Sequence, residues 1–95
     1  MKNLIISPEI ETKLRDKHQL NRADVEQAFL NRDGECLIDT REQHRTNPAT
    51  EWFIAANDKG QRIKVAFVPD NGKLYLRTAY LANPEEIRIY KKFAY

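Results

Sequence analysis

Hydrophobic and polar residues alternate with a period of two over residues 61–80, on both sides of an Asn71-Gly72 pair. This alternation is typical of strands that bury one face. Asn-Gly readily adopts the positive φ values of a two-residue hairpin turn, so we predict a β-hairpin over this stretch. The expected cross-strand pairs are Phe67 with Leu76, Val65 with Thr78, and Ile63 with Tyr80.

The same register gives the hairpin a second, basic face, which carries Arg62, Lys64 and Arg77, with Tyr75 beside them. The pattern leaves two interpretations of this face open: a solvated outer surface, or a surface for an anionic ligand. It assigns Tyr80 to the apolar face, where an aromatic residue ordinarily packs in the core.

Two helices are predicted before the hairpin. Ser7 is a suitable N-cap and Pro8 a suitable first helical residue, and this helix should end near His18. Asn21 is the expected N-cap of the second helix, which should end near Asn31. The buried stripe expected on the second helix consists of Val25, Ala28 and Phe29.

A third helix is predicted after the hairpin, because residues 83–86 have the Asn-Pro-Glu-Glu pattern of a capping box. Tyr90 on this helix is expected to pack in the core. Short strands are expected at residues 3–6, 35–40 and 50–57, and a polar loop at 41–49. The resulting order, β-α-α-β-β-β-β-α, predicts one α+β domain over residues 1–95, with an antiparallel sheet packed by helices.

Composition narrows the class of protein. Net charge is only +2, yet residues 60–95 carry seven Lys/Arg against three acids, and residues 1–59 carry nine against eleven. The basic half favours an anionic partner. There is one cysteine, Cys36, and no apolar run reaches the roughly 20 residues of a membrane span. We therefore expect a cytoplasmic protein that does not enter a membrane.

The candidate chemistry involves no metal and no cofactor, because two histidines and one cysteine without close spacing do not form a metal motif. His18 either neutralises helix-end carbonyls or transfers protons near neutral pH. RNA cleavage without a metal needs a group that orients the 2′-hydroxyl, cations for the phosphorane, and an acid for the leaving oxygen. The candidate substrate-binding residues are Arg62, Lys64, Tyr75, His44 and Arg45.

Short motifs along nearly the whole chain resemble BrnT-like toxins. Residues 14–18 end in a Lys-His pair, and the acidic-apolar helix 23–29 follows them, as in that family. The later matching positions are Asp39 and Arg41, then Trp52-Phe53-Ile54, Arg77 before an Ala-Tyr pair, and Glu86 with Tyr90.

This resemblance implies a RelE-like fold and the toxin of a type II toxin–antitoxin pair. Such a toxin is a metal-independent endoribonuclease that a protein antitoxin wraps and silences. The catalytic residues it implies are Lys17, His18, Arg41 and Arg77. The chain departs from the family pattern at Gln19, where glycine is usual, and at Thr78-Ala79-Tyr80, where Ser-Ala-Arg is common.

These departures leave open a divergent active toxin or a relative that has lost activity. The alternative function is therefore a non-catalytic module that binds a protein or a nucleic acid. Under the toxin interpretation the partners are an RNA substrate and a cognate antitoxin, and the chain forms either a homodimer or a toxin–antitoxin heterocomplex.

Overall fold

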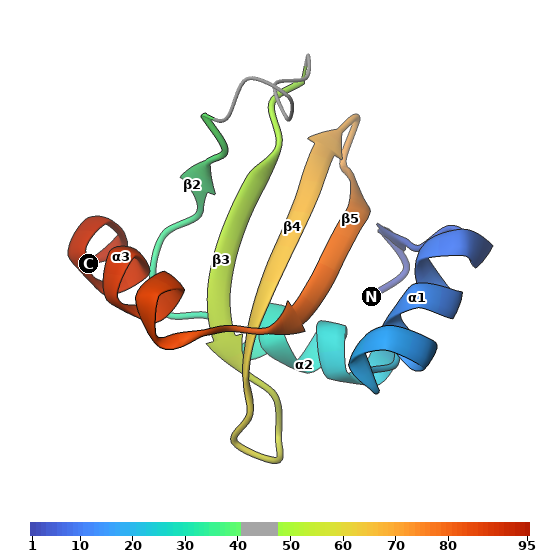
Figure 1. The fold of residues 1–95 in the computed structure, drawn as a ribbon. Coiled ribbons are helices and arrows are strands. Elements are labelled where there is room, and N and C mark those ends of the chain that lie inside the picture. Colours follow the sequence, from blue (N-terminus) through green and yellow to red (C-terminus); the bar gives the residue numbers. More distant parts are fainter. Residues whose placement is uncertain (41–47) are drawn as a thin grey trace.

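Three helices pack around a five-stranded sheet in the computed structural model, which describes residues 1–40 and 48–95 (Figure 1). The elements follow one another along the chain in the predicted succession, and the α+β class is confirmed. They are β1 (Leu4–Ile5), α1 (Pro8–His18), α2 (Arg22–Asn31), β2 (Leu37–Ile38), β3 (Glu51–Ala56), β4 (Arg62–Asp70), β5 (Lys73–Leu81) and α3 (Pro84–Ala94).

The sheet has the order β1-β5-β4-β3-β2. Strands β2 to β5 form an antiparallel meander, but β1 pairs in parallel with β5 through Leu4 opposite Leu74. The prediction of a wholly antiparallel sheet is therefore wrong at this edge. No turn joins β1 directly to β5, since all other elements except α3 lie between them along the chain, so their direction is not fixed by a hairpin.

The helix ends follow the predicted capping residues. Ser7 Oγ accepts a hydrogen bond from the backbone N–H of Ile10 at 3.3 Å. Asn21 and Asp24 form a reciprocal capping box at the start of α2, and Asn83 and Glu86 form another at the start of α3. These bonds satisfy N–H groups that have no partner within a helix.

The main core lies between α2 and one face of the sheet. Phe29 of α2 contacts Phe53 and Phe67 edge-on, with ring centroids 4.9 and 5.2 Å apart. Val25 and Ala28 are fully buried beside them, so the predicted stripe of α2 packs as expected. We call this face, which carries Phe53, Val65, Phe67 and Ala79, the back face of the sheet.

A β-bulge in β5 changes the predicted hairpin register. The turn at Asn71-Gly72 has the expected positive φ values, 53° and 76°, and Phe67 pairs with Leu76 as predicted. Beyond that point the register shifts, because two residues of β5 oppose one residue of β4 and Arg77 has no partner. The pairs that result are Ala66 with Thr78, Val65 with Ala79, Lys64 with Tyr80, and Ile63 with Leu81.

The bulge moves Tyr80 to the opposite side of the sheet. Because side chains alternate along a strand, Ala79 now occupies the back face, where it is fully buried. Tyr80 shares the other face with its partner Lys64. The prediction that Tyr80 packs on the apolar face of the hairpin is therefore wrong. We call this second face, which carries Trp52, Lys64, Ala66, Thr78 and Tyr80, the front face.

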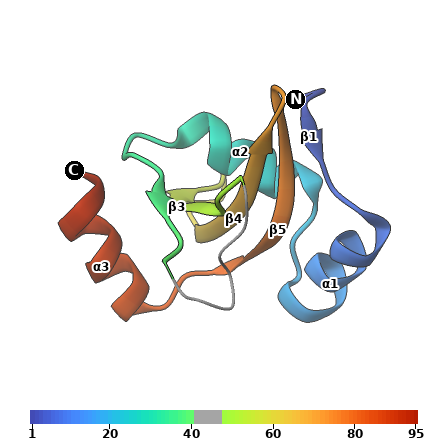
Figure 2. The same cartoon turned by 90° about the horizontal axis from the view of Figure 1, so that it is seen from above.

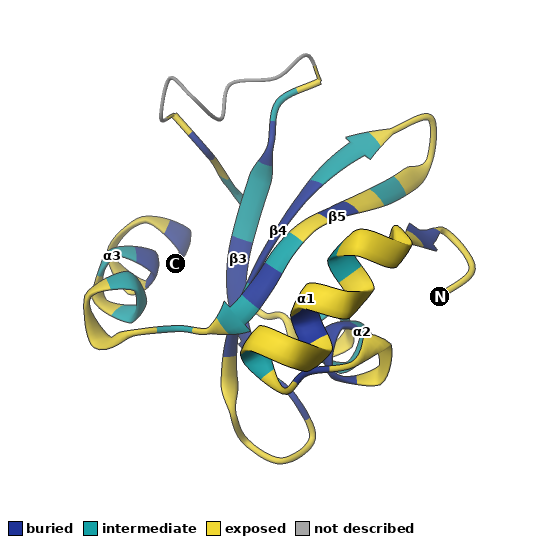
Figure 3. Cartoon of the chain, turned by 45° about the vertical axis from the view of Figure 1, so that its right-hand side comes forward, coloured by how far each residue is buried: buried dark blue, intermediate teal, exposed yellow. Residues whose placement is uncertain are grey.

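Two of the three helices flank the front face without covering its middle. Seen from above, α2 lies behind the sheet, whereas α1 and α3 stand at the two sides of the front (Figure 2). α3 packs on the β2–β3 side, with Tyr90 against Trp52 at 5.6 Å between ring centroids. α1 packs along β5 through its buried Leu14, and most of its outer surface is exposed (Figure 3). No helix in the described residues is long and apolar enough to span a bilayer.

Candidate functional site

The ring of Tyr80 lies close to two residues that are far apart in the sequence, His18 and Lys64. His18, the last residue of α1, places its imidazole 5.8 Å from the Tyr80 ring, measured between centroids. The Nζ atom of Lys64 on β4 lies 5.9 Å from the same ring. The structure thus brings together His18 and Lys64, two of the residues predicted from the sequence, around a residue that the sequence analysis assigned to the core.

Lys64 is held in an aromatic and acidic environment. Its Nζ atom lies 4.5 Å from the centroid of the Trp52 ring and 3.1 Å from a carboxylate oxygen of Glu86. Only 13% of the Lys64 side chain and 17% of the Glu86 side chain is exposed. A cation over the face of an indole is attracted by the ring quadrupole, so Trp52 and Glu86 together hold the Lys64 ammonium group on the front face.

Glu86 links the start of α3 to this cluster. One carboxylate oxygen accepts the backbone N–H of Asn83 at 3.0 Å. The other oxygen accepts both the hydroxyl of Tyr80 at 2.5 Å and Nζ of Lys64. Burial raises the pKa of Glu86, but the hydrogen bonds from Tyr80, Asn83 and Lys64 outweigh it and leave the pKa below its usual value. Glu86 is therefore an anion at neutral pH.

A groove opens next to Lys64, between β2 and α3. Its volume is about 650 Å³. Apolar side chains form most of its walls, and Phe93 and Ile38 on those walls remain 61% and 53% exposed. The residues that define it are Leu37, Asp39, Trp52, Lys64, Ile89 and Phe93.

Three other residues predicted for the site are exposed: Arg77 and Tyr75 on β5, the strand of Tyr80, and Lys17 on α1. Arg77 is exposed at the bulge of β5. Tyr75 is 38% exposed near the hairpin turn, opposite Ile5 of β1. Lys17 is exposed on α1, next to His18 along the chain.

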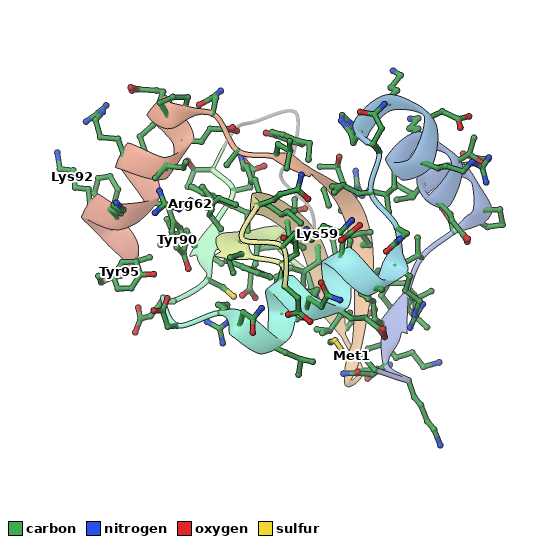
Figure 4. The ribbon with its side chains drawn as sticks, turned by 90° about the horizontal axis from the view of Figure 1, so that it is seen from below. Met1, Lys59, Arg62, Tyr90, Lys92 and Tyr95 are labelled. Atoms are coloured by element: carbon green, nitrogen blue, oxygen red, sulfur yellow. The ribbon has the colours of Figure 1, made fainter. Side chains whose placement is uncertain are left out.

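Arg62 lies in a different hollow from Lys64, although both are on β4. This second hollow has a volume of about 230 Å³ and is lined by Arg62, Tyr90 and Tyr95, among others; Figure 4 shows these three residues beside α3. Tyr90 is buried and donates a 2.8 Å hydrogen bond to the carbonyl oxygen of Glu35, so the prediction that Tyr90 packs in the core is confirmed. Burial, with smaller effects from neighbouring charges, raises the pKa of Tyr90 to about 12.

Cys36 is half-buried against the core, and burial raises the pKa of its thiol, which disfavours the thiolate form. Arg41, which the resemblance implies as a catalytic residue, and the candidate substrate-binding residues His44 and Arg45 lie outside the described residues.

The sequence pattern does not indicate the contacts of Tyr80 and indicates only part of the role of Glu86. The capping pattern identified Glu86 as a helix cap, but nothing in it pointed to Lys64. Tyr80 was assigned to the wrong face of the sheet because strict alternation does not include the extra residue that the bulge adds at Arg77.

The arrangement provides cations, a histidine and a tyrosine on one surface. No group of three His, Cys, Asp or Glu side chains within residues 1–40 and 48–95 is arranged to hold a metal ion. The described groups can bind an anion through Lys64 and exchange protons through His18.

Neither a protein-family model, nor a curated protein, nor a solved structure matches this chain.

Proposed function

We propose that this chain is a metal-independent endoribonuclease and the toxin of a type II toxin–antitoxin pair, with a BrnT-like, RelE-like fold and a cytoplasmic site of action. One observation carries the proposal: His18 and Lys64 converge on the ring of Tyr80, on a sheet face flanked by two helices (Figure 2). This cluster combines a proton-transfer group with a fixed cation, two of the things that RNA cleavage through the 2′-hydroxyl requires.

Lys64 and Arg77 are proposed to hold the scissile phosphate. An ammonium group has three donors, and Glu86 takes one of those of Lys64, so others remain for phosphate oxygens. Arg77 lies three residues before Tyr80, about 10 Å along the strand at roughly 3.3 Å per residue. An exposed arginine there contacts the same or the adjacent phosphate of an extended RNA strand.

His18 is proposed to transfer a proton during cleavage, and Lys17 and Arg41 to contribute positive charge. In this reaction the 2′-hydroxyl gives up its proton as its oxygen attacks the neighbouring phosphorus, the P–O5′ bond breaks, and the leaving 5′-oxygen receives a proton. His18 is half-buried at the end of α1 and packs on Tyr80, so its imidazole has a restricted position from which to act.

The test is inducible expression in a bacterial host, with growth and total RNA followed over time. Wild type should arrest growth and cut RNA, whereas Arg77→Ala should do neither. Because Arg77 is exposed, its substitution should change the free energy of unfolding by no more than about 0.5 kcal/mol. Arg15→Ala, which removes an exposed arginine from α1, is the matched control and should behave as wild type. Normal growth with intact RNA, despite folded wild-type protein, would refute the proposal.

A non-catalytic binding module is the second candidate function, and the apolar groove between β2 and α3 is the observation that favours it. Exposed Phe93 and Ile38 are suited to a partner surface. Under this function, Arg77→Ala at most weakens a complex.

A further inference from the structure

The groove beside Lys64 has a composition that suits one nucleotide. Most of its lining is apolar and includes Trp52, and the Nζ atom of Lys64 lies 4.5 Å from the centroid of that indole, so a flat apolar surface lies directly next to a cation. Its volume, about 650 Å³, falls within the range of roughly 300–1,000 Å³ that is usual for small-ligand sites. A nucleotide has the matching parts, a flat base joined to a phosphate.

We infer that this groove binds a nucleobase of the RNA, next to the phosphate that Lys64 contacts. The inference rests on the proposed function, since it identifies which part of the substrate occupies the groove. The base would contact three residues that line the groove, Phe93 on α3, Leu37 on β2 and Trp52 on β3. Aromatic side chains accept any base through its π-face, so the contact itself does not depend on sequence.

The charges at the groove favour a nucleotide over an apolar protein segment. Lys64 lines the groove, and Lys92 places its Nζ atom 5.4 Å from the ring of Phe93, another lining residue. Two cations separated by an apolar slot match a base flanked by phosphates. An apolar helix from a partner would contact the walls but would offer nothing to these ammonium groups.

The single tryptophan of the chain makes the inference measurable without cleavage. Trp52 lines the groove, and no other residue contributes indole fluorescence. The four nucleoside 5′-monophosphates are titrated against the folded protein, with ribose 5-phosphate as the probe that lacks a base. The nucleotides should quench Trp52 with saturation, and ribose 5-phosphate should not.

A pair of variants assigns the signal to the groove. Phe93→Ala should weaken nucleotide binding by roughly tenfold or more, because it removes an aromatic contact with the base. Leu30→Ala is the matched control: Leu30 is also an exposed apolar residue, 76% accessible, but lies on α2 behind the sheet. It should leave the affinity unchanged.

The outcomes separate this inference from the proposed function. If nucleotides bind at Trp52 but no RNA is cut, the groove assignment stands and the ribonuclease proposal fails. If RNA is cut but Trp52 does not respond to nucleotides, or responds equally to ribose 5-phosphate, the groove assignment is overturned. Binding of an amphipathic helical peptide in place of nucleotides would also overturn it and would make the groove a protein-docking site.

Discussion

The hydroxyl of Tyr80 donates a 2.5 Å hydrogen bond to the carboxylate of Glu86, and this bond connects strand β5 to the first turn of α3. Lys64 donates to the same carboxylate oxygen from β4. Three elements therefore meet at one partly buried anion on the front face, and His18 of α1 packs against the tyrosine that completes the cluster. The position of α3 and the charge of the proposed site are thus physically coupled.

Removing only the Tyr80 hydroxyl should weaken this connection. In Tyr80→Phe the ring contacts with His18 and Lys64 are retained, but Glu86 loses its shortest hydrogen bond. We expect the pKa of Glu86 to rise and the free energy of unfolding to fall by about 1 kcal/mol. Carboxyl NMR titration and urea unfolding measure the two effects. An unchanged Glu86 pKa in the variant would contradict this account.

The lowered pKa of Glu86 predicts the pH dependence of stability. A carboxylate whose pKa is lower in the folded than in the unfolded state contributes stability that is present above its unfolded value, near 4.5, and is lost as pH falls through the folded pKa. Glu86→Gln lacks this contribution. The difference in unfolding free energy between wild type and Glu86→Gln should therefore be largest at neutral pH and shrink in acid. A difference that is constant from pH 7 to pH 3 would be inconsistent with the ion pair.

A side chain at Gly34 is predicted to clash with Tyr90. A Cβ atom at this position would lie 2.6 Å from the Tyr90 hydroxyl and 3.0 Å from the Tyr95 ring. Gly34→Ala should thus destabilise the fold by about 1–3 kcal/mol through overpacking. Tyr90→Phe removes the nearest atom, so the double variant should be more stable than the sum of the two single effects predicts. Strict additivity in urea unfolding would argue against this contact.

Asn57 forms a buried polar junction between β3, the loop after it and α2. Its amide NH₂ donates to Asp24 at 3.1 Å and to Gln61 at 2.8 Å. Its amide oxygen accepts the backbone N–H groups of Lys59 and Gln61. Because only 2% of Asn57 is exposed, water cannot replace these bonds in Asn57→Ala.

We expect Asn57→Ala to lower the free energy of unfolding by about 1–3 kcal/mol. Asn31→Ala is the matched control, since Asn31 is exposed and also bonds the β3–β4 region, through the carbonyl oxygen of Ala56 and the side chain of Asp58. Its effect should be clearly smaller. Equal decreases in the free energy of unfolding for the two variants, measured by thermal or urea unfolding, would show that burial does not explain the contribution of Asn57 to stability.

Local signals explain why much of the fold could be predicted. Ser7, Asn21 and Asn83 cap helices because their short side chains reach the first free N–H groups, and this depends only on nearby residues. The Asn71-Gly72 turn likewise follows from the φ values that these residues tolerate. Such features were predicted correctly from the sequence.

The site depends on features that are not local. The bulge at Arg77 inverts the faces of the rest of β5, and the residues after it are apolar enough to fit either face. The parallel pairing of Leu4 with Leu74 is decided by packing across the whole chain. As a result, the sequence analysis predicted His18 and Lys64 as site residues but not Tyr80, the residue that they both contact.

The most direct test of the central claim is the cleavage of a defined RNA by purified protein in the presence of EDTA, with wild type compared to His18→Gln. The account predicts that wild type produces fragments ending in a 2′,3′-cyclic phosphate, and that His18→Gln remains folded but loses most of this activity. Cleavage by His18→Gln at the wild-type rate, or no cleavage by folded wild-type protein, would contradict it.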